Sequence, residues 1–396
     1  MEKSSIFQRI PPKRDGRGTI VLAGSIAQRP ARAGHTWVFL QYLLGLRRLG
    51  WQVLFVDWLD EAMCGRPVGE SRHAKYLRSV MERFALEDSF SLLDRGNGQV
   101  VAGLPRHELL REAQRSALLL NVMGYLDDEE ILATAPRRVF LDIDPGFPQM
   151  WRELGLADLL TGHDDFVTIG ERVGRGDCSI PTAGLKWITT RPPVVLEHWQ
   201  RRHECDQRAF TSVVTWRGPF GPLEYNGKTY GLRVHEFRKF VELPRRLGRP
   251  FELAIDIHAD DERDRALLEE NGWRLVDPVE AAGDPDRYQA YVAGSFAELM
   301  VAKHMYVETR SGWFSDRSAC YLASGRPVLA QDTGLDGLFP LGEGLVAFRT
   351  LEEAVAGVEA ISGDYESHAA AARGIAEEHF DSDRVLAALL SALSVS

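Results

Sequence analysis

The sequence predicts an α/β protein made of two doubly wound parallel sheets, and three observations support this fold class. Short apolar runs alternate with segments of helical periodicity, beginning with TIVLAGS at 19–25 and HTWVFLQYLLGLRRLG at 35–50. A charged segment punctuated by prolines, residues 191–206, interrupts the alternation. The alternation restarts with TSVVTW at 211–216. Two such stretches in 396 residues indicate two domains of ordinary size.

The first stretch contains the strand, helix, strand unit that is typical of a parallel sheet with right-handed crossovers. After a tight turn at Gly50, the run WQVLFVDW at 51–58 is the second predicted strand. The elements that follow are a strand at 116–126, a helix at 127–136, and strands at 137–145 and 164–170. We therefore expect an N-terminal domain over residues 1–198.

The second stretch repeats this order of elements, and we expect a C-terminal domain over residues 206–380. Residues 351–393 are helical in pattern, with breaks near Gly363 and Asp381. Two sheets in tandem leave a cleft between them, and ligands bind beyond the carboxyl ends of parallel strands, so we expect an active site between the domains. The predicted helices cover 234–248, 260–272, 285–302 and 316–325, and the predicted strands after 211–216 cover 251–257, 273–277, 305–310 and 327–332.

Composition narrows the function classes. The formal net charge of -10 disfavours a protein that binds the backbone of duplex nucleic acid. The cysteines stand apart, without a CxxC pair or histidines at zinc spacing, which disfavours both a disulfide framework and a structural metal site. The polar, basic N-terminus has no apolar core of signal-peptide length, and no window approaches the roughly 18 apolar residues of a membrane span. We expect a soluble protein of the cytoplasm.

The stretch SGWFSDRSACYLASG, residues 311–325, predicts a loop that leads into a helix. Backbone N–H groups at a helix start, together with the positive end of the helix dipole, favour a phosphate group. Ser315 is the predicted cap of this helix, and Arg317 would add positive charge. The alternative is a structural helix that Ser315 or Asp316 merely caps. The residues assigned to phosphate binding here are Gly312, Trp313, Phe314, Ser315, Asp316, Arg317 and Ser318.

Two features resemble glycosyltransferases of the class with two Rossmann-like domains, called GT-B. The run ASGRPV at 323–328 has the form small-x-Gly-x-Pro-Val, which follows the phosphate-binding loop in the donor domain of that class. The pair Gly34-His35 opens the helix before Gly50, as in inverting members of the antibiotic and plant types. The resemblance covers most of the chain. It implies a cleft that binds a nucleoside diphosphate sugar and a small or medium hydroxyl acceptor, and a C-terminal helix at 381–396 that packs back on the N-terminal domain.

Two departures from the class bear on the reaction. Retaining members usually carry two glutamates eight positions apart in the donor loop, where this chain has Gly312 and Cys320. The plant signature with His and Gln is absent as well. An inverting transfer is therefore the expected reaction. The alternatives are a retaining transferase that lacks the glutamate pair, a non-catalytic protein that binds nucleotide sugars, and a two-domain sugar epimerase.

The resemblance assigns the role of catalytic base to His35, because the His of the Gly-His pair has that role in inverting relatives. An imidazole with a pKa of about 6.5 can take a proton from the acceptor hydroxyl at neutral pH. Asp142 stands where relatives place the carboxylate that orients this His, and Asp144, two residues on, would share its side of the strand. The structural alternatives are a helix-terminal residue for His35 and a turn carboxylate before Pro145 for Asp142.

The other candidate residues follow predicted strands. Gly218, Lys228 and Arg233 lie in a Gly-rich segment from which relatives grip the donor diphosphate with a basic side chain. Val276 stands where relatives read the nucleobase, and Glu308 is expected to bind a ribose or sugar hydroxyl. Each has a plain structural alternative, such as a surface charge or a salt bridge at a strand end. The candidates for sugar or acceptor contacts are Gly34, Asp144, His163, Thr168 and Asp332.

The resemblance implies neither a metal ion nor another cofactor, because relatives neutralise the leaving diphosphate with a helix terminus and basic side chains. The string Asp142-Ile143-Asp144 has the form DxD of metal-dependent transferases. It lies in the first domain, away from the predicted donor loop. We therefore interpret it as unrelated to metal binding.

Overall fold

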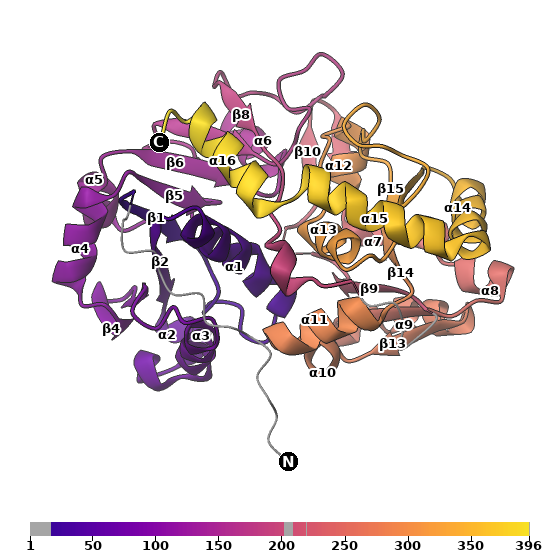
Figure 1. The fold of residues 1–396 in the computed structure, drawn as a ribbon, viewed down its shortest axis with the longest axis horizontal. Helices are drawn as coiled ribbons and strands as arrows, with labels where there is room; N and C mark the ends of the chain where they lie inside the picture. Colours follow the sequence, from indigo (N-terminus) through magenta and orange to yellow (C-terminus); the bar gives the residue numbers. More distant parts are fainter. Residues whose placement is uncertain (1–16, 202–208, 219, 396) are drawn as a thin grey trace.

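The structure is a computed structural model that describes residues 17–201, 209–218 and 220–395. Two α/β halves lie side by side, each with a central sheet and helices on its faces (Figure 1). The predicted pair of doubly wound sheets is therefore confirmed. Residues 202–208, which include part of the predicted domain boundary, lie outside the described residues, as does most of the N-terminal segment expected to lack a signal peptide.

The N-terminal sheet has eight strands in the order β4-β3-β2-β1-β5-β6-β7-β8. All neighbours in it are parallel except β3 and β4. The strand order reverses at β1, which makes the ends of β1 and β5 a binding crevice. The strands are β1 Thr19–Ala23, β2 Gln52–Leu59, β3 Phe90–Asp94, β4 Gln99–Gly103, β5 Leu118–Val122, β6 Arg138–Asp142, β7 Asp165–Thr168 and β8 Trp187–Thr189. The helices are α1 Ala33–Arg48, α2 Glu61–Cys64, α3 Arg72–Arg83, α4 Arg106–Arg115, α5 Glu129–Thr134 and α6 Phe147–Glu153, with short 3-10 helices at Val68–Glu70 and Leu196–His198.

The C-terminal sheet has six parallel strands in the order β13-β12-β9-β14-β15-β16. These are β9 Phe210–Thr215, β12 Phe251–Asp256, β13 Trp273–Val276, β14 Ala297–Met300, β15 Val328–Gln331 and β16 Leu345–Phe348, and a separate hairpin is formed by β10 Leu223–Tyr225 and β11 Lys228–Tyr230. The helices are α7 Arg233–Phe237, α8 Leu243–Leu247, α9 Glu262–Glu270, α10 Pro278–Ala282, α11 Pro285–Gly294, α12 His304–Thr309, α13 Asp316–Ala323, α14 Leu351–Gly363, α15 Tyr365–His379 and α16 Ser382–Ala392, with short 3-10 helices at Arg238–Phe240 and Ala259–Asp261.

Two predictions for the C-terminal domain are wrong. The helix expected at 285–302 ends at Gly294, and its last residues form the buried strand β14 between β9 and β15. The strand expected at 305–310 is the helix α12. The buried Glu298 carboxylate interrupts the apolar run of β14, and such a run is the pattern that predicts a buried strand. The carboxylate is accommodated by an ion pair with Arg317.

Several elements carried no recognisable pattern. The sequence assigned nothing to residues 59–115, where α2, α3, α4 and the pair β3 and β4 lie. The hairpin β10–β11 lies in the Gly-rich segment, for which no strand was predicted, and β16 was not predicted either. These strands are short, and β4 is exposed or half-buried along its length. A strand of that kind gives little apolar alternation.

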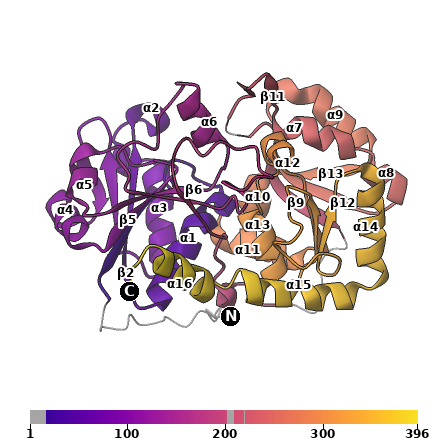
Figure 2. The ribbon, with the colours of Figure 1, turned by 90° about the horizontal axis from the view of Figure 1, so that it is seen from above.

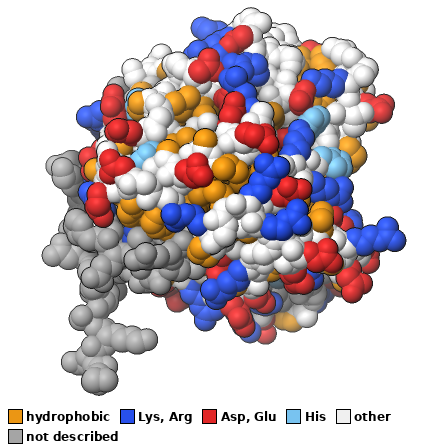
Figure 3. All heavy atoms as spheres, turned by 90° about the vertical axis from the view of Figure 1, so that its right-hand side faces the viewer, with side chains coloured by type: hydrophobic (Ala, Val, Ile, Leu, Met, Phe, Trp, Pro, Cys, Tyr) orange, Lys and Arg blue, Asp and Glu red, His pale blue; other side chains and the backbone are white. Residues whose placement is uncertain are grey.

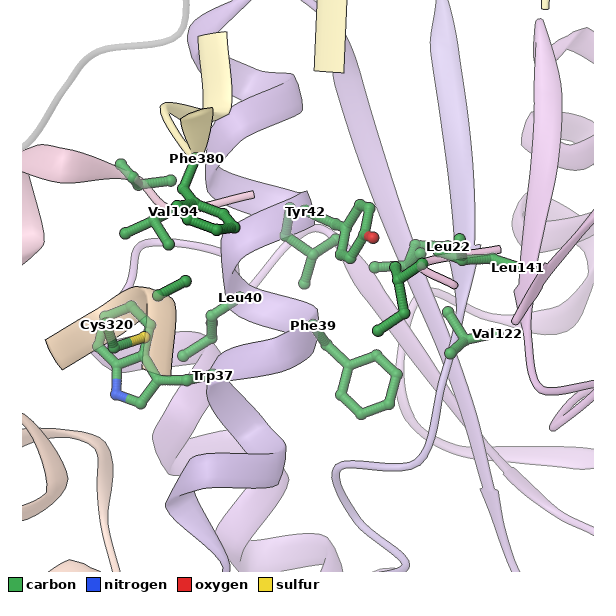
Figure 4. Packing of buried hydrophobic residues seen from close by; sticks show 14 of the residues in the cluster. Leu22, Trp37, Phe39, Leu40, Tyr42, Val122, Leu141, Val194, Cys320 and Phe380 are labelled. Atoms are coloured by element: carbon green, nitrogen blue, oxygen red, sulfur yellow. The ribbon is translucent and has the colours of Figure 1, made fainter. Parts of the chain in front are cut away.

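Helix α1 lies between the two sheets and is buried on nearly all sides. In Figure 4, Phe39 and Tyr42 point toward Leu22 and Leu141 of the N-terminal sheet, whereas Trp37 lies next to Cys320 of α13. The same apolar cluster therefore contains residues from both domains. A helix that is apolar all round is expected in such a position.

The chain ends on the N-terminal domain. Helix α15 runs along the C-terminal domain, and α16 continues from it to lie against α1 (Figures 1 and 2). Arg48 of α1 forms an ion pair with Asp383 of α16, with Nε and Oδ1 3.0 Å apart. Arg137 before β6 donates a hydrogen bond to the carbonyl of Leu393. Among the residues described, each helix is either too short or too polar to cross a lipid bilayer.

Candidate functional site

An ion pair joins the two domains where the carboxyl ends of their sheets face each other. Asp144 follows β6 of the first domain, and Lys303 follows β14 of the second. The Lys303 Nζ lies 2.6 Å from each oxygen of the Asp144 carboxylate. Only 10% of the lysine side chain and 15% of the aspartate side chain is exposed. Burial lowers the pKa of Lys303, although Asp144 opposes this effect.

Aromatic rings enclose this pair. The Lys303 Nζ lies 5.2 Å from the ring centre of Phe147 and 5.1 Å from that of Phe220, close enough for cation–π attraction. Tyr306 of α12 donates a hydrogen bond to Asp144. Gly218 borders the same lysine, since a Cβ at Gly218 would lie 3.9 Å from Lys303 Cε. The ammonium group is therefore held in a largely apolar enclosure at the domain boundary.

Two arginines next to this pair have no carboxylate partner among the described residues. Arg233, at the start of α7, donates to the Thr215 carbonyl over 3.1 Å, and its buried Nε has no hydrogen-bond partner there. Burial and the charge of Arg317 lower its pKa to about 10. Arg29 lies exposed in the loop after β1, and its charge lowers the pKa of Lys303. The carboxylates of Asp144 and Asp316 act on the pKa of Arg233 from nearby and oppose its fall.

His35 lies in the first turn of α1, close enough to Arg29 for the charge of the arginine to act on it. Its Nε2 is 2.8 Å from the hydroxyl of the fully buried Ser25. Burial and the charge of Arg29 lower the pKa of His35 to about 3, so its imidazole is neutral at physiological pH. Gly34 permits close packing here, because a Cβ at this position would lie 3.2 Å from the Tyr288 ring of α11.

Asp142 does not orient His35, which corrects the predicted pairing. Its Oδ2 accepts hydrogen bonds from Gln149 over 2.8 Å and from Thr168 over 2.9 Å. Its Oδ1 accepts from the backbone of Asp144 over 2.9 Å. Burial raises the pKa of Asp142 to about 6. The carboxylate holds the turns after β6 and β7 together and so positions Asp144.

The loop predicted to cradle phosphate is largely engaged by the protein itself. The Gly312 N–H donates to the Thr333 carbonyl over 2.8 Å, and the Trp313 N–H donates to the Ser311 hydroxyl over 3.2 Å. The Trp313 ring stacks on Tyr306, with ring centres 4.3 Å apart. Phe314 packs on two phenylalanines, Phe339 and Phe380. Both aromatic residues of this loop therefore belong to the core.

The start of α13 differs from the prediction in its cap. Ser315 occupies the N-cap position, but its side chain makes no capping hydrogen bond. Arg317 forms an ion pair with Glu298 and donates to the Val213 carbonyl over 3.0 Å. The buried Ser318 hydroxyl has no hydrogen-bond partner within the part of the chain that is described. Burial raises the pKa of Asp316 to about 6.

Four other candidates are engaged with protein groups outside the Lys303–Asp144 pair. Lys228 of β11 and Glu308 form an ion pair with each other, and Glu308 lies on α12 and not at a strand end as predicted. Asp332 accepts from the Gly334 and Leu335 N–H groups and pairs with Arg349. His163 contacts the Asn121 side chain over 3.1 Å and the Leu160 carbonyl over 3.2 Å. Val276 ends β13 and is half-buried.

Sequence reasoning missed Lys303, Tyr306, Arg29 and Ser25. Lys303 and Tyr306 were not predicted, because a helix was expected at 285–302 in place of β14. The carboxyl end of that strand, which Lys303 follows, was therefore not recognised. With the strand at 297–300, the next polar residue after its end is Lys303, and that position would have marked the lysine. Within the described residues, no group of three or more His, Cys, Asp or Glu side chains is arranged to hold a metal ion.

The chain resembles solved structures of known proteins in its overall fold. No family model and no curated protein matches the chain. Among solved structures, HepE of Anabaena in complex with UDP and glucose is 11% identical, with a TM-score of 0.59 over 95% of this chain and 99% of that one. Sucrose-phosphate synthase from Thermosynechococcus elongatus is 12% identical, with a TM-score of 0.56 over 95% and 98%.

An α-glucosyltransferase in complex with UDP and a mismatched DNA is 10% identical, with a TM-score of 0.57 over 95% of this chain and 99% of that one. The likeness extends over nearly the whole length of each chain, and both domains are included. The predicted GT-B fold is thereby confirmed.

Proposed function

We propose that this chain, which has the GT-B fold, is a glycosyltransferase that moves a sugar from a nucleoside diphosphate to a hydroxyl acceptor. The observation that carries the proposal is the set of cations at the facing sheet ends. Lys303 is paired with Asp144, whereas Arg29 and Arg233 have no carboxylate partner among the described residues. Two arginines without a direct carboxylate contact offer positive charge and N–H donors to the two phosphate groups of a diphosphate.

The same cations suit the chemistry of the transfer. When the bond between the sugar and the diphosphate breaks, negative charge develops on the leaving phosphate oxygen. Positive groups held in a partly water-excluded site stabilise that charge most effectively. Arg233 is already desolvated, which is reflected in its lowered pKa of about 10. The proposal therefore assigns charge neutralisation to side chains and requires neither a metal ion nor another cofactor.

The mechanistic part of the proposal is an inverting transfer with His35 as the general base. In this proposal the His35 Nε2–H donates to the Ser25 hydroxyl, so the lone pair of the neutral imidazole lies on Nδ1, and Nδ1 takes the acceptor proton. A pKa of about 3 makes it a weak base, so positioning has to supply much of its effect. Cys320, at one of the two positions of the missing glutamates, is buried against Gln41, which favours an inverting over a retaining reaction.

We propose a small or medium hydroxyl acceptor, although one similar structure, the α-glucosyltransferase, contains DNA. In Figure 3, the visible face of the C-terminal domain carries acidic and basic side chains interspersed. The whole chain has a net charge of -10. Duplex DNA is held by continuous rows of basic side chains, so neither feature favours it. A cytoplasmic location remains part of this proposal.

A thermal-shift screen with UDP, GDP and dTDP tests the donor site. At a nucleotide concentration of 100 times Kd, the expected gain in unfolding free energy is about 2.7 kcal/mol. No shift with any of the three nucleotides would overturn the donor proposal. Binding without turnover of any corresponding sugar nucleotide would favour the non-catalytic alternative. Release of nucleotide and an altered free sugar without acceptor would favour the epimerase.

Replacement of His35 by Ala tests the base. The variant should lose at least about 100-fold in kcat, the lower end of general-base effects, while the Kd for nucleotide stays within twofold. Transfer at the wild-type rate would remove His35 from the mechanism without affecting the donor proposal. The anomeric configuration of the product, read by NMR, separates inverting from retaining transfer.

A further inference from the structure

The loop that follows β1, residues 24–32, carries two groups of the candidate site. Ser25 is the hydrogen-bond partner of the His35 ring. The charge of Arg29 lowers the pKa of His35 in the first domain and of Lys303 in the second, so the guanidinium lies near groups of both domains. The positions of Ser25 and Arg29 therefore depend on what holds this loop in place.

The carboxylate of Asp57, near the end of β2, holds the loop. It is fully buried, and the chain leaves β1 beside it, because the Gly24 N–H donates to the Val56 carbonyl over 3.0 Å. The Asp57 Oδ2 accepts from the Ala27 N–H over 2.6 Å. Its Oδ1 accepts from the side-chain amide of Gln28 over 2.9 Å. Both oxygens of the carboxylate thus bind donors of the same loop.

A buried carboxylate is a costly way to hold a loop. Asp57 forms no ion pair within the part of the chain that the structure describes. Burial raises its pKa to about 7, although hydrogen bonds from Gln28, Ala27 and the Trp58 N–H oppose this effect. A neutral side chain would hold an ordinary loop with less desolvation. A carboxylate has one advantage, because both of its oxygens accept and neither donates, so several N–H groups can converge on it.

The loop is attached at a second point, and both attachments precede Arg29. The Ala27 carbonyl accepts from Nδ1 of His73 in α3 over 2.8 Å. The Arg29 N–H donates to the Ile26 carbonyl over 3.3 Å, which closes a turn at this position. The backbone that leads to Arg29 is therefore fixed, whereas its side chain is exposed. A fixed backbone limits the positions that the guanidinium can reach.

We propose that Asp57 is a positioning residue of the transfer reaction. Through the loop it fixes Ser25, which orients His35, and Arg29, one of the cations for the diphosphate. The inference rests on the proposed function and adds to it the group that holds the base and a cation in place. An asparagine at this position has a single acceptor oxygen, and its NH2 group would face an N–H donor of the loop. The loop should then move away from β2.

Nitrogen-15 NMR of protein labelled at histidine tests the effect on His35. In the wild type the ring should be neutral at pH 7 and at pH 5, because its pKa is about 3, and its Nε2 proton should exchange slowly with water. In Asp57→Asn this proton should exchange about tenfold faster or more. The ring should also be partly protonated at pH 5, because Arg29 no longer lies near it. A change confined to stability would alter neither reading of the folded protein.

Titration calorimetry with inorganic pyrophosphate tests the effect on Arg29, and its Kd should rise about three- to tenfold in Asp57→Asn. Asp94→Asn is the matched control. Asp94 ends the neighbouring strand β3 and likewise accepts from a backbone N–H and a side-chain amide, those of Gly96 over 2.9 Å and Asn97 over 3.2 Å. This variant should leave the pyrophosphate Kd and the exchange of the His35 proton unchanged.

Gln28→Met is the milder variant if Asp57→Asn does not fold, because it removes one donor to Asp57 and keeps the carboxylate. It should change the exchange of the His35 proton in the same direction, by about threefold. Wild-type exchange of this proton in folded Asp57→Asn, or in Gln28→Met where only that variant folds, would overturn the positioning role. If pyrophosphate did not bind the wild type, the donor proposal would fail, and the His35 spectrum would still decide on Asp57.

Discussion

At the scale of single residues, Arg233 differs from most arginines of the protein because it is half-buried, with a buried Nε, and forms no ion pair among the described residues. Arg317, whose charge lowers the pKa of Arg233, is itself compensated by Glu298. A partly desolvated cation without a direct ion pair costs stability, and its retention is explained when a ligand supplies a negative charge in contact with it. If a diphosphate binds Arg233, removal of this arginine should weaken nucleotide binding without lowering stability.

We expect Arg233→Met to separate binding from stability. The Kd for nucleoside diphosphate should rise about 10- to 100-fold, which corresponds to about 1.4 to 2.7 kcal/mol. The melting temperature of the free protein should stay level or rise, because a partly desolvated charge without a direct ion pair is removed. Titration calorimetry and thermal melts measure the two effects.

Arg238→Met is the control for this variant. Arg238 lies at the end of the same helix but is already paired with Asp264 over 2.8 Å. Its loss should leave the nucleotide Kd unchanged. If Arg233→Met bound nucleotide like the wild type, the diphosphate would have to lie elsewhere.

The half-buried, partly desolvated carboxyl of Asp316 makes stability depend on pH. Its folded-state pKa of about 6 lies above the usual 3.8, so the folded protein favours the protonated form. Ionisation therefore weakens the fold progressively as pH rises from about 4 to about 6, and the full cost is present above that range. Asp316→Asn removes this cost at high pH only.

The difference in unfolding free energy between Asp316→Asn and wild type should thus move in favour of the variant from pH 4 to pH 8. The expected change is on the order of 2 kcal/mol, measured by urea unfolding at both pH values. A difference that is the same at pH 4 and pH 8 would mean that the carboxyl is not desolvated.

At the scale of elements, α1 connects the whole arrangement, because it packs on the N-terminal sheet, on α13 and on α16. Its contact with α16 depends on Gly45. A Cβ at that position would lie 2.5 Å from Leu386 and 2.9 Å from Ser382, so even one methyl group forces the helices apart. The last helix therefore reaches the first domain through a contact that requires glycine.

Gly45→Ala should destabilise the protein by about 1 to 3 kcal/mol, since overpacking outweighs the gain in helix propensity. Gly374→Ala in α15 is the matched variant, because a Cβ added at Gly374 would meet no neighbouring atom within 4 Å. It should stabilise the protein by about 0.5 to 1 kcal/mol. Urea unfolding measures both values, and equal effects of the two variants would contradict the close contact between α1 and α16.

At the scale of the whole molecule, one apolar cluster extends through both domains. It includes Trp37 of α1, Cys320 of α13 and Phe380 before α16. In Figure 4, Trp37 lies next to Cys320 and Phe380 lies next to Val194. Loss of either domain would expose this shared core to water. Stability is therefore expected to be a property of the complete chain.

We expect heat unfolding in a single calorimetric transition whose enthalpy equals the van't Hoff enthalpy, although many two-domain proteins deviate from two-state behaviour. Differential scanning calorimetry at pH 7 tests this. Two resolved transitions would show that the domains unfold independently and that the shared cluster contributes little to their coupling.

The sequence by itself determined the architecture. The alternation of apolar runs with helical periods predicts two doubly wound sheets. In the second domain, the run ASGRPV at 323–328 lies where α13 ends and β15 begins. These patterns are local, because the side chains that face the core recur every second residue in a strand and every three to four residues in a helix. The alternation failed where a buried strand contains a charge, as Glu298 does in β14.

Only the tertiary structure decided which side chains meet. Asp144 and Lys303 are 159 residues apart in the chain, and their ion pair follows from how the two sheets face each other. The small cavity lined by Tyr42 and Asp316 also depends on contacts between distant elements. Asp142 ends a strand, as predicted, but its carboxylate accepts hydrogen bonds from Gln149 and Thr168 and not from His35. Local periodicity sets the side on which a residue lies, but its partner depends on contacts between distant elements, which no local pattern records.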